Sequence, residues 1–77
     1  MWVLRGFERA CERLLSERLM EGITVETVRS LWNLPEEDPA YDSYPVSPAI
    51  ANSLQETLSI ELNLDFAEEE YLLEFEV

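Results

Sequence analysis

The stretch Tyr71-Leu72-Leu73-Glu74-Phe75-Glu76-Val77 decides the fold class of this chain. Its large apolar residues recur at every second position, and acidic residues fill two of the three positions between them. A period of two over seven residues is typical of a strand with one buried and one solvated face. We therefore predict a strand over 71–77 and a fold that contains a sheet.

The run before this strand also alternates, but its structure stays open. Ile60, Leu62, Leu64 and Phe66 alternate with polar residues, which favours a second strand. Residues 64–70, with three consecutive glutamates at their end, are equally compatible with a short turn of helix.

A helix is predicted over 48–58, because its start carries two independent signals. Ser47 is a good N-cap, and Pro48 occupies the first helical position, where proline is tolerated. The apolar residues of this segment fall on one helical stripe and are Ile50, Ala51, Leu54 and Leu58.

A second helix is predicted over 24–33. Thr24 is a suitable N-cap, and Glu26 lies in the first turn, where the helix dipole favours negative charge. Pro35 ends the helix, because a residue before proline avoids helical geometry. The apolar face of this helix consists of Val25, Val28, Leu31 and Trp32.

Between the two helices, residues 34–46 are predicted to form a long loop. Pro35, Pro39 and Pro45 exclude a helix and a central strand. Long ordered loops of this kind often carry function.

The first twenty residues admit two structures. Phe7, Ala10, Leu14 and other apolar residues approach helical spacing, which predicts a helix from about 5 to 20. The strand-like start at residues 2–4 and the helix-weakening Gly6 favour a hairpin of strands 2–9 and 12–20 instead. Its turn, near Ala10-Cys11, lacks the Asn-Gly or Asp-Gly pair typical of tight hairpins.

The charge of the chain restricts its function. Seventeen Asp and Glu face five Arg, with no Lys and no His, and the formal net charge is −12 over 77 residues. Such a protein repels nucleic acid and anionic membranes and is attracted to basic protein surfaces. The absence of His and Lys argues against an enzyme. With one cysteine, Cys11, no intrachain disulfide is possible, so we expect a single cytoplasmic domain.

Parts of the sequence resemble a known group of proteins. The residues that carry the resemblance are 22–26, 28–31, the run Pro35-Glu36-Glu37-Asp38-Pro39-Ala40-Tyr41-Asp42-Ser43-Tyr44-Pro45-Val46, and the strand at 71–75. They resemble small acidic immunity-type proteins associated with bacterial toxin systems. The resemblance implies an α+β fold, in which an N-terminal hairpin and the C-terminal strand form a small antiparallel sheet packed with two helices. The alternative is three helices and a C-terminal β-hairpin.

The candidate binding residues lie in the loop and in the last strand. Carboxylates accept bidentate arginine, and tyrosines supply large contact areas at low entropic cost. The same residues could also shape turns, cover the core or form an ordinary polar face. We expect no catalytic residues, no metal site and no cofactor. The candidate partner-binding residues are Glu36, Glu37, Asp38, Tyr41, Asp42, Tyr44, Glu74 and Glu76.

These features predict a protein-binding inhibitor that covers a basic surface of a cognate bacterial toxin or nuclease. One alternative is a phage-encoded, anti-CRISPR-like inhibitor that mimics nucleic acid. Another is a structural protein that forms a homodimer through its apolar strand edge. The expected partner is a basic protein, without direct contact to nucleic acid or membrane, and self-association stays possible.

Overall fold

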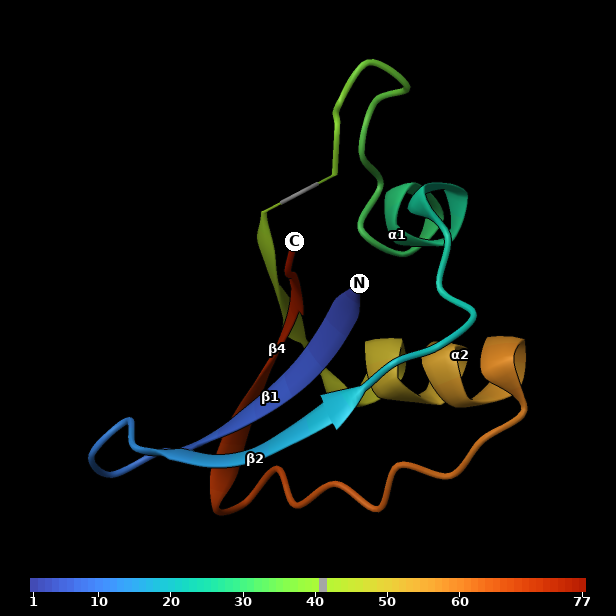
Figure 1. Ribbon diagram of the computed structural model, residues 1–77. Helices are drawn as coiled ribbons and strands as arrows, with labels where there is room; N and C mark the ends of the chain where they lie inside the picture. Colours follow the sequence, from blue (N-terminus) through green and yellow to red (C-terminus); the bar gives the residue numbers. More distant parts are fainter. Residues whose placement is uncertain (41) are drawn as a thin grey trace.

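The computed structural model describes residues 1–40 and 42–77 and has an α+β fold. Four antiparallel strands form one sheet, and two helices pack against it (Figure 1). The elements in chain order are β1 (Trp2–Glu8), β2 (Leu14–Leu19), α1 (Val25–Leu31), β3 (Ser43–Val46), α2 (Pro48–Leu58) and β4 (Glu69–Phe75).

The strand order in the sheet is β2-β1-β4-β3, so the first and last strands of the chain are central neighbours. In the β1–β4 pair, Leu4 lies opposite Leu73 and Gly6 opposite Tyr71. The two ends of the described chain therefore meet, and the backbone N–H of Glu76 donates to the carbonyl of Met1 at 2.7 Å (Figure 1).

The N-terminal hairpin is confirmed, and the helical alternative for residues 5–20 is wrong. The turn is longer than a two-residue turn and spans residues 9–13, with a left-handed Glu12 (φ 56°). The N–H of Glu8 donates to the carbonyl of Arg13 at 2.8 Å. A five-residue loop does not need the Asn-Gly pair, which explains why the sequence lacks it. Cys11 is exposed at this turn.

Both predicted helices form, and the bounds of one of them are corrected. The helix α2 covers residues 48–58 as predicted, and the Ser47 hydroxyl accepts the N–H of Ile50 at 3.2 Å. The helix α1 is shorter than the predicted 24–33, because Thr24 is its N-cap and it ends at Leu31. Asn33 then takes a left-handed conformation (φ 53°), so the helix stops before Pro35 exerts its effect.

The predicted loop 34–46 is wrong in its last four residues, which form β3. Pro45 is compatible with this strand because β3 lies at the edge of the sheet, where one side of the backbone needs no partner. The strand β4 also begins two residues earlier than predicted and ends at Phe75. Its first residues, Glu69 and Glu70, pair with Glu8 and Phe7 of the long strand β1.

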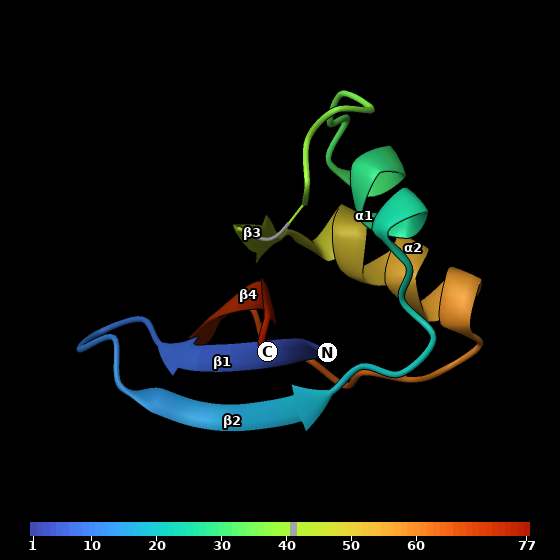
Figure 2. The same ribbon diagram turned by 45° about the horizontal axis from the view of Figure 1, so that its top comes forward.

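Both helices lie on the same side of the sheet, and the opposite side carries none (Figure 2). Side chains from alternate strand positions meet the helices, among them Leu4, Tyr44 and Leu73. Leu54 of α2 and Val28 of α1 are completely buried against them. Residues 60–68 form neither a strand nor a helix, and this segment reaches the same core through Leu62.

Gly6 allows the close approach of β1, β2 and β4. A Cβ atom at this position would lie 2.5 Å from the Ser16 hydroxyl and 2.9 Å from Cε1 of Tyr71. A larger residue would therefore force the side chains of Ser16, Tyr71 and Glu69 to shift. No described helix is long and apolar enough to span a membrane.

Candidate functional site

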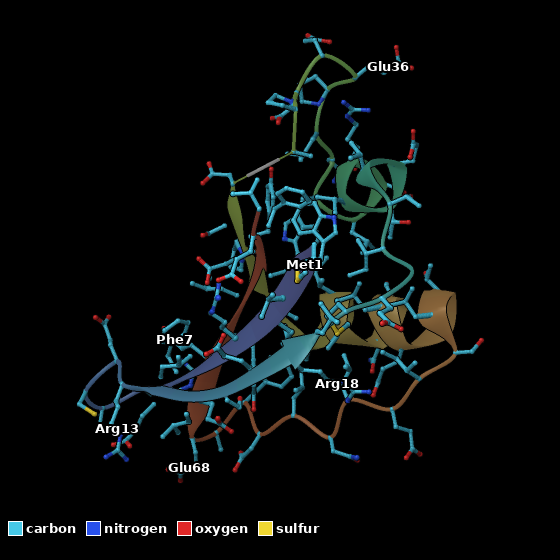
Figure 3. All side chains as sticks on the ribbon, viewed as in Figure 1. Met1, Phe7, Arg13, Arg18, Glu36 and Glu68 are labelled. Carbon is cyan, nitrogen blue, oxygen red and sulfur yellow. The ribbon has the colours of Figure 1, made fainter. Side chains whose placement is uncertain are left out.

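The side of the sheet without helices, here called the open face, combines charged and apolar side chains. The cross-strand register places Ser43, Glu74, Val3 and Leu19 in one row across the four strands. The next row contains Pro45, Leu72, Arg5 and Glu17. Phe7 follows on β1, and Figure 3 shows it on the side of the sheet away from the helices.

Arg5 is the centre of this face. Its guanidinium forms ion pairs with Glu17 at 3.2 Å, with Glu74 at 3.2 Å and with Glu76. The Arg5 side chain is only 16 % exposed, whereas those of Glu17 and Glu76 are 50 % and 49 % exposed. The arginine therefore holds three carboxylates together, and two of them keep a free, solvated side.

The hydrogen bond to Glu76 is the largest of the effects that raise the pKa of Arg5, and partial desolvation opposes it. The hydrogen bond to Glu74 and the charges of Glu76 and Glu17 also raise the pKa of Arg5. Arg5 is thus a permanent cation, and its role is to fix the positions of acidic neighbours.

The end of the long loop joins this group through Ser43. The Ser43 hydroxyl donates to Oε2 of Glu74 at 2.6 Å, and the Ser43 N–H donates to Oδ1 of Asp42 at 2.8 Å. We name the group of Arg5, Glu17, Asp42, Ser43, Glu74 and Glu76 the Arg5 cluster. Four carboxylates and one guanidinium give it a formal charge of −3.

The predicted acidic residues of the loop do not all belong to the Arg5 cluster. Glu36 and Glu37 are exposed, and Glu36 lies at the tip of the loop, which projects away from the sheet (Figure 3). Asp38 shapes the turn instead, because its Oδ1 accepts the N–H of Ala40 at 2.8 Å. Its carbonyl also accepts two N–H groups of Arg29, at 3.0 and 2.6 Å.

The prediction that Tyr44 contacts a partner is wrong, because only 7 % of this residue is exposed. Its ring lies 6.3 Å from that of Trp2 and 5.2 Å from that of Trp32, centre to centre. It points to the helix-covered side because Ser43 and Pro45 on either side of it occupy the open face. Tyr41, the other predicted tyrosine, lies outside the described residues.

All five arginines are bound within the molecule. Besides Arg5, Arg9 pairs with Glu70 and Arg13 with Glu8, both at 3.1 Å. Arg18 donates to the carbonyl of Glu61 at 2.9 Å, and Arg29 donates to that of Asp38. Within residues 1–40 and 42–77, these contacts leave 12 of the 17 carboxylates without an arginine partner. Folding therefore does not neutralise the acidic surplus.

Sequence reasoning missed Arg5, Glu17 and Ser43. Alternation within 2–9 and 12–20 puts Arg5 and Glu17 on the faces opposite Leu4 and Arg18, but it does not show that they meet. That contact needs the register between strands, in which Arg5 lies opposite both Glu17 and Leu72.

The described part of the chain shows no cluster of three or more metal-ligating side chains. A groove of about 530 Å³ lies near the end of β3, with Trp32, Ile50 and Phe66 in its lining. Its one arginine, Arg9, is bound to Glu70 and to the carbonyl of Phe66. The groove thus has apolar walls, and its arginine is already paired. These features favour a role in side-chain packing over a role in catalysis.

Comparison with known proteins gives a family but no described activity. A search of curated proteins finds no match to this chain. One family matches residues 1–74, which include all six helices and strands except the final residue of β4. The chain therefore belongs to the family described as a domain of unknown function (DUF7683).

Proposed function

We propose that this protein is a cytoplasmic inhibitor of the immunity type, which binds a basic bacterial toxin or nuclease and covers its cationic surface. The protein acts by occupying a surface and not by catalysis. The observation that carries the proposal is that all five arginines are bound internally, while most carboxylates have no arginine partner among the residues that the structure describes. A cationic partner supplies the charges that the fold lacks.

The Arg5 cluster is the part of the surface best suited to this contact. One arginine holds three of its four carboxylates, Glu17 on β2, Glu74 on β4 and Glu76 just after β4, so little side-chain freedom is lost when they bind. Glu17 and Glu76 each keep about half of their side chain in solvent, which leaves oxygens free to accept from arginine or lysine. The neighbouring Leu19 and Phe7 add apolar area to the same face.

Charge and apolar area have separate roles in this mechanism. The field of 12 excess negative charges accelerates the encounter with a basic partner, and salt weakens that acceleration. Buried apolar and aromatic contacts supply most of the lasting affinity. The inhibitor therefore associates rapidly and blocks the partner sterically.

The test starts from the product of a toxin-like gene next to the gene for this protein. We expect co-expression to rescue growth and the purified pair to form a complex. Its association rate should fall by about tenfold or more between low and physiological salt. Failure to bind, or a rate that does not depend on salt, would contradict the proposal.

A pair of matched variants locates the contact. Replacing Glu17 and Glu76 by glutamine removes two charges from the Arg5 cluster, and replacing Glu56 and Glu61 removes two exposed charges elsewhere. We expect the first pair to slow association several-fold more than the second. Asp38 and Asp42 are unsuitable for this test, because both accept backbone N–H groups and their replacement would disturb the loop. Equal effects of the two pairs would show that the cluster has no special role.

A further inference from the structure

The strand β2 is an edge strand with an unusual degree of exposure. All six of its residues are exposed, including Leu14, Leu15 and Leu19 at 43 %, 45 % and 50 %. Leu15 is the extra residue of a bulge, because Gly6 pairs with Ser16 and Phe7 with Leu14. Natural edge strands are usually protected by lysine, proline or covering loops, and an exposed apolar edge is a template for another strand.

The register shows which backbone groups of β2 are available. The N–H of Met20 donates to the carbonyl of Trp2, so these opposed residues form a hydrogen-bonded pair. Hydrogen-bonded and non-hydrogen-bonded pairs alternate along an antiparallel ladder. Arg18 and Ser16 therefore bond to β1, whereas the N–H and C=O groups of Glu17 and Leu19 point outward. The side chains of these two residues lie on the open face.

The charge of the molecule selects the occupant of this edge. A second copy would bring another net charge of −12 close to the first. A cationic strand would be attracted by the same negative field. A Lys or Arg opposite Glu17 could pair with the Glu17 carboxylate, because that side chain is half exposed. An apolar residue two positions away on that strand would lie opposite Leu19.

We propose that β2 binds an extended segment of a cationic protein as a fifth strand of the sheet. The segment carries a basic residue opposite Glu17 and an apolar residue opposite Leu19. This binding mode rests on the proposed function for the charge of the partner, but the position of the contact follows from the sheet alone. Main-chain hydrogen bonds supply affinity, and the alternating side chains supply specificity.

A capped synthetic peptide, Lys-Thr-Val-Thr-Lys-Thr-Val-Thr-Lys, tests the inference on the intact protein. Its lysines and valines share one face when it is extended. We expect it to slow hydrogen exchange at the N–H groups of Glu17 and Leu19 by at least tenfold. The same peptide with glutamate in place of lysine should give no protection. Protection at the 36–38 loop tip instead, or none at millimolar peptide, would overturn the inference.

Two substitutions at Leu19 separate the contribution of the backbone N–H to peptide binding from that of the side chain. Leu19→Pro removes an outward N–H without breaking the ladder to β1, and Leu19→Thr keeps that N–H while shortening the side chain. We expect the first to abolish peptide binding and the second to weaken it only a few-fold. Equal affinity of both variants would contradict strand addition. If Leu19→Pro fails to fold, the exchange experiment on the unmodified protein still decides.

Sedimentation at low and high protein concentration tests the rival occupant. We expect a single species of monomer mass throughout. A doubled mass together with protection of Glu17 and Leu19 in the absence of peptide would assign the edge to a second copy and overturn the inference. If the toxin partner binds in a salt-dependent way but Leu19→Pro has no effect on that binding, the inference fails while the proposed function stands.

Discussion

The two edge strands of the sheet present different backbones to a neighbouring chain. At the β3 edge, the outward positions are Ser43 and Pro45. The N–H of Ser43 is bound by Asp42, and the carbonyl of Pro45 accepts the indole N–H of Trp32 at 2.9 Å. Pro45 has no N–H to offer. At the β2 edge, Glu17 and Leu19 show the opposite arrangement, since their outward groups have no such partners among the described contacts.

The comparison shows that edge protection in this protein is selective. At the β3 edge, the Asp42 carboxylate accepts the outward N–H of Ser43. Pro45 has no N–H, and the Trp32 indole donates to the outward carbonyl of Pro45. The other edge carries exposed leucines, which lie outside the core cluster. Because unprotected edges carry a risk of aggregation, the open β2 edge, at the opposite side of the sheet from the closed β3 edge, supports the binding edge proposed above.

The largest effect is expected for Leu73→Ala, which disrupts β4 beneath the closed edge. Leu73 is fully buried between Leu4 and Tyr44, so its truncation leaves a cavity and should lower the free energy of unfolding by about 2–5 kcal/mol. Chemical denaturation measures this loss. Leu72→Ala, on the open face of the same strand, is the control and should cost clearly less. Similar losses at both positions would mean that the open face is also packed.

A smaller effect is expected for Trp32→Phe, which opens the β3 edge. The variant loses the hydrogen bond to Pro45 and part of the contact with the Tyr44 ring. We expect a loss of about 1–2 kcal/mol in the free energy of unfolding, measured by urea titration. Light scattering should also detect more self-association than in the unmodified protein. An unchanged scattering signal would show that the freed carbonyl does not weaken the protection of this edge.

Tyr71→Phe tests how the segment 60–68 is attached to the sheet. The Tyr71 hydroxyl accepts the N–H of Asp65 at 2.9 Å and donates to Glu69 at 2.8 Å. Loss of both bonds should cost about 1 kcal/mol near neutral pH. In urea titration, Tyr71→Phe should therefore lose less free energy of unfolding than Trp32→Phe.

The same residue predicts a pH dependence with a definite sign. Burial is the main cause that raises the pKa of Tyr71 above its ordinary value of 10.0, so the folded protein binds this proton more tightly than the unfolded chain. The free energy of unfolding should fall as the pH rises from 10.0 through the folded pKa, and Tyr71 should have no such effect below this window. Denaturation at several pH values should show a shallower alkaline decline in Tyr71→Phe. Equal slopes would contradict the assignment.

The smallest effect on stability is expected for Leu19→Ser at the open edge. Leu19 is 50 % exposed, so its replacement should change the free energy of unfolding by about 0.5 kcal/mol or less. Leu4→Ala is the matched control on the neighbouring strand, because Leu4 is 3 % exposed and lies one row away on the covered face. A large loss in Leu19→Ser would show that the β2 leucines are structural, and it would weaken the case for a binding edge.

Local signals in the sequence predicted the helices and the last strand well. Ser47 and Pro48 placed the start of α2 because capping depends only on neighbouring residues. The alternation at 71–77 placed Tyr71, Leu73 and Phe75 on the covered face. The hairpin was not decided by such signals, because its five-residue turn has no distinctive residue pair and the apolar residues of β2 are exposed. The resemblance to immunity-type proteins selected the correct alternative.

The sequence by itself determined the acidic surplus, the absence of histidine and lysine, both helix starts and the alternation of β4. The tertiary structure alone decided that Ser43–Val46 becomes a strand and that Tyr44 is buried. It also decided that Arg5 meets Glu74, 69 residues away in the chain. The physical reason is range: caps and periodicity act over a few residues, whereas strand register and ion pairing depend on which distant segments the core brings together.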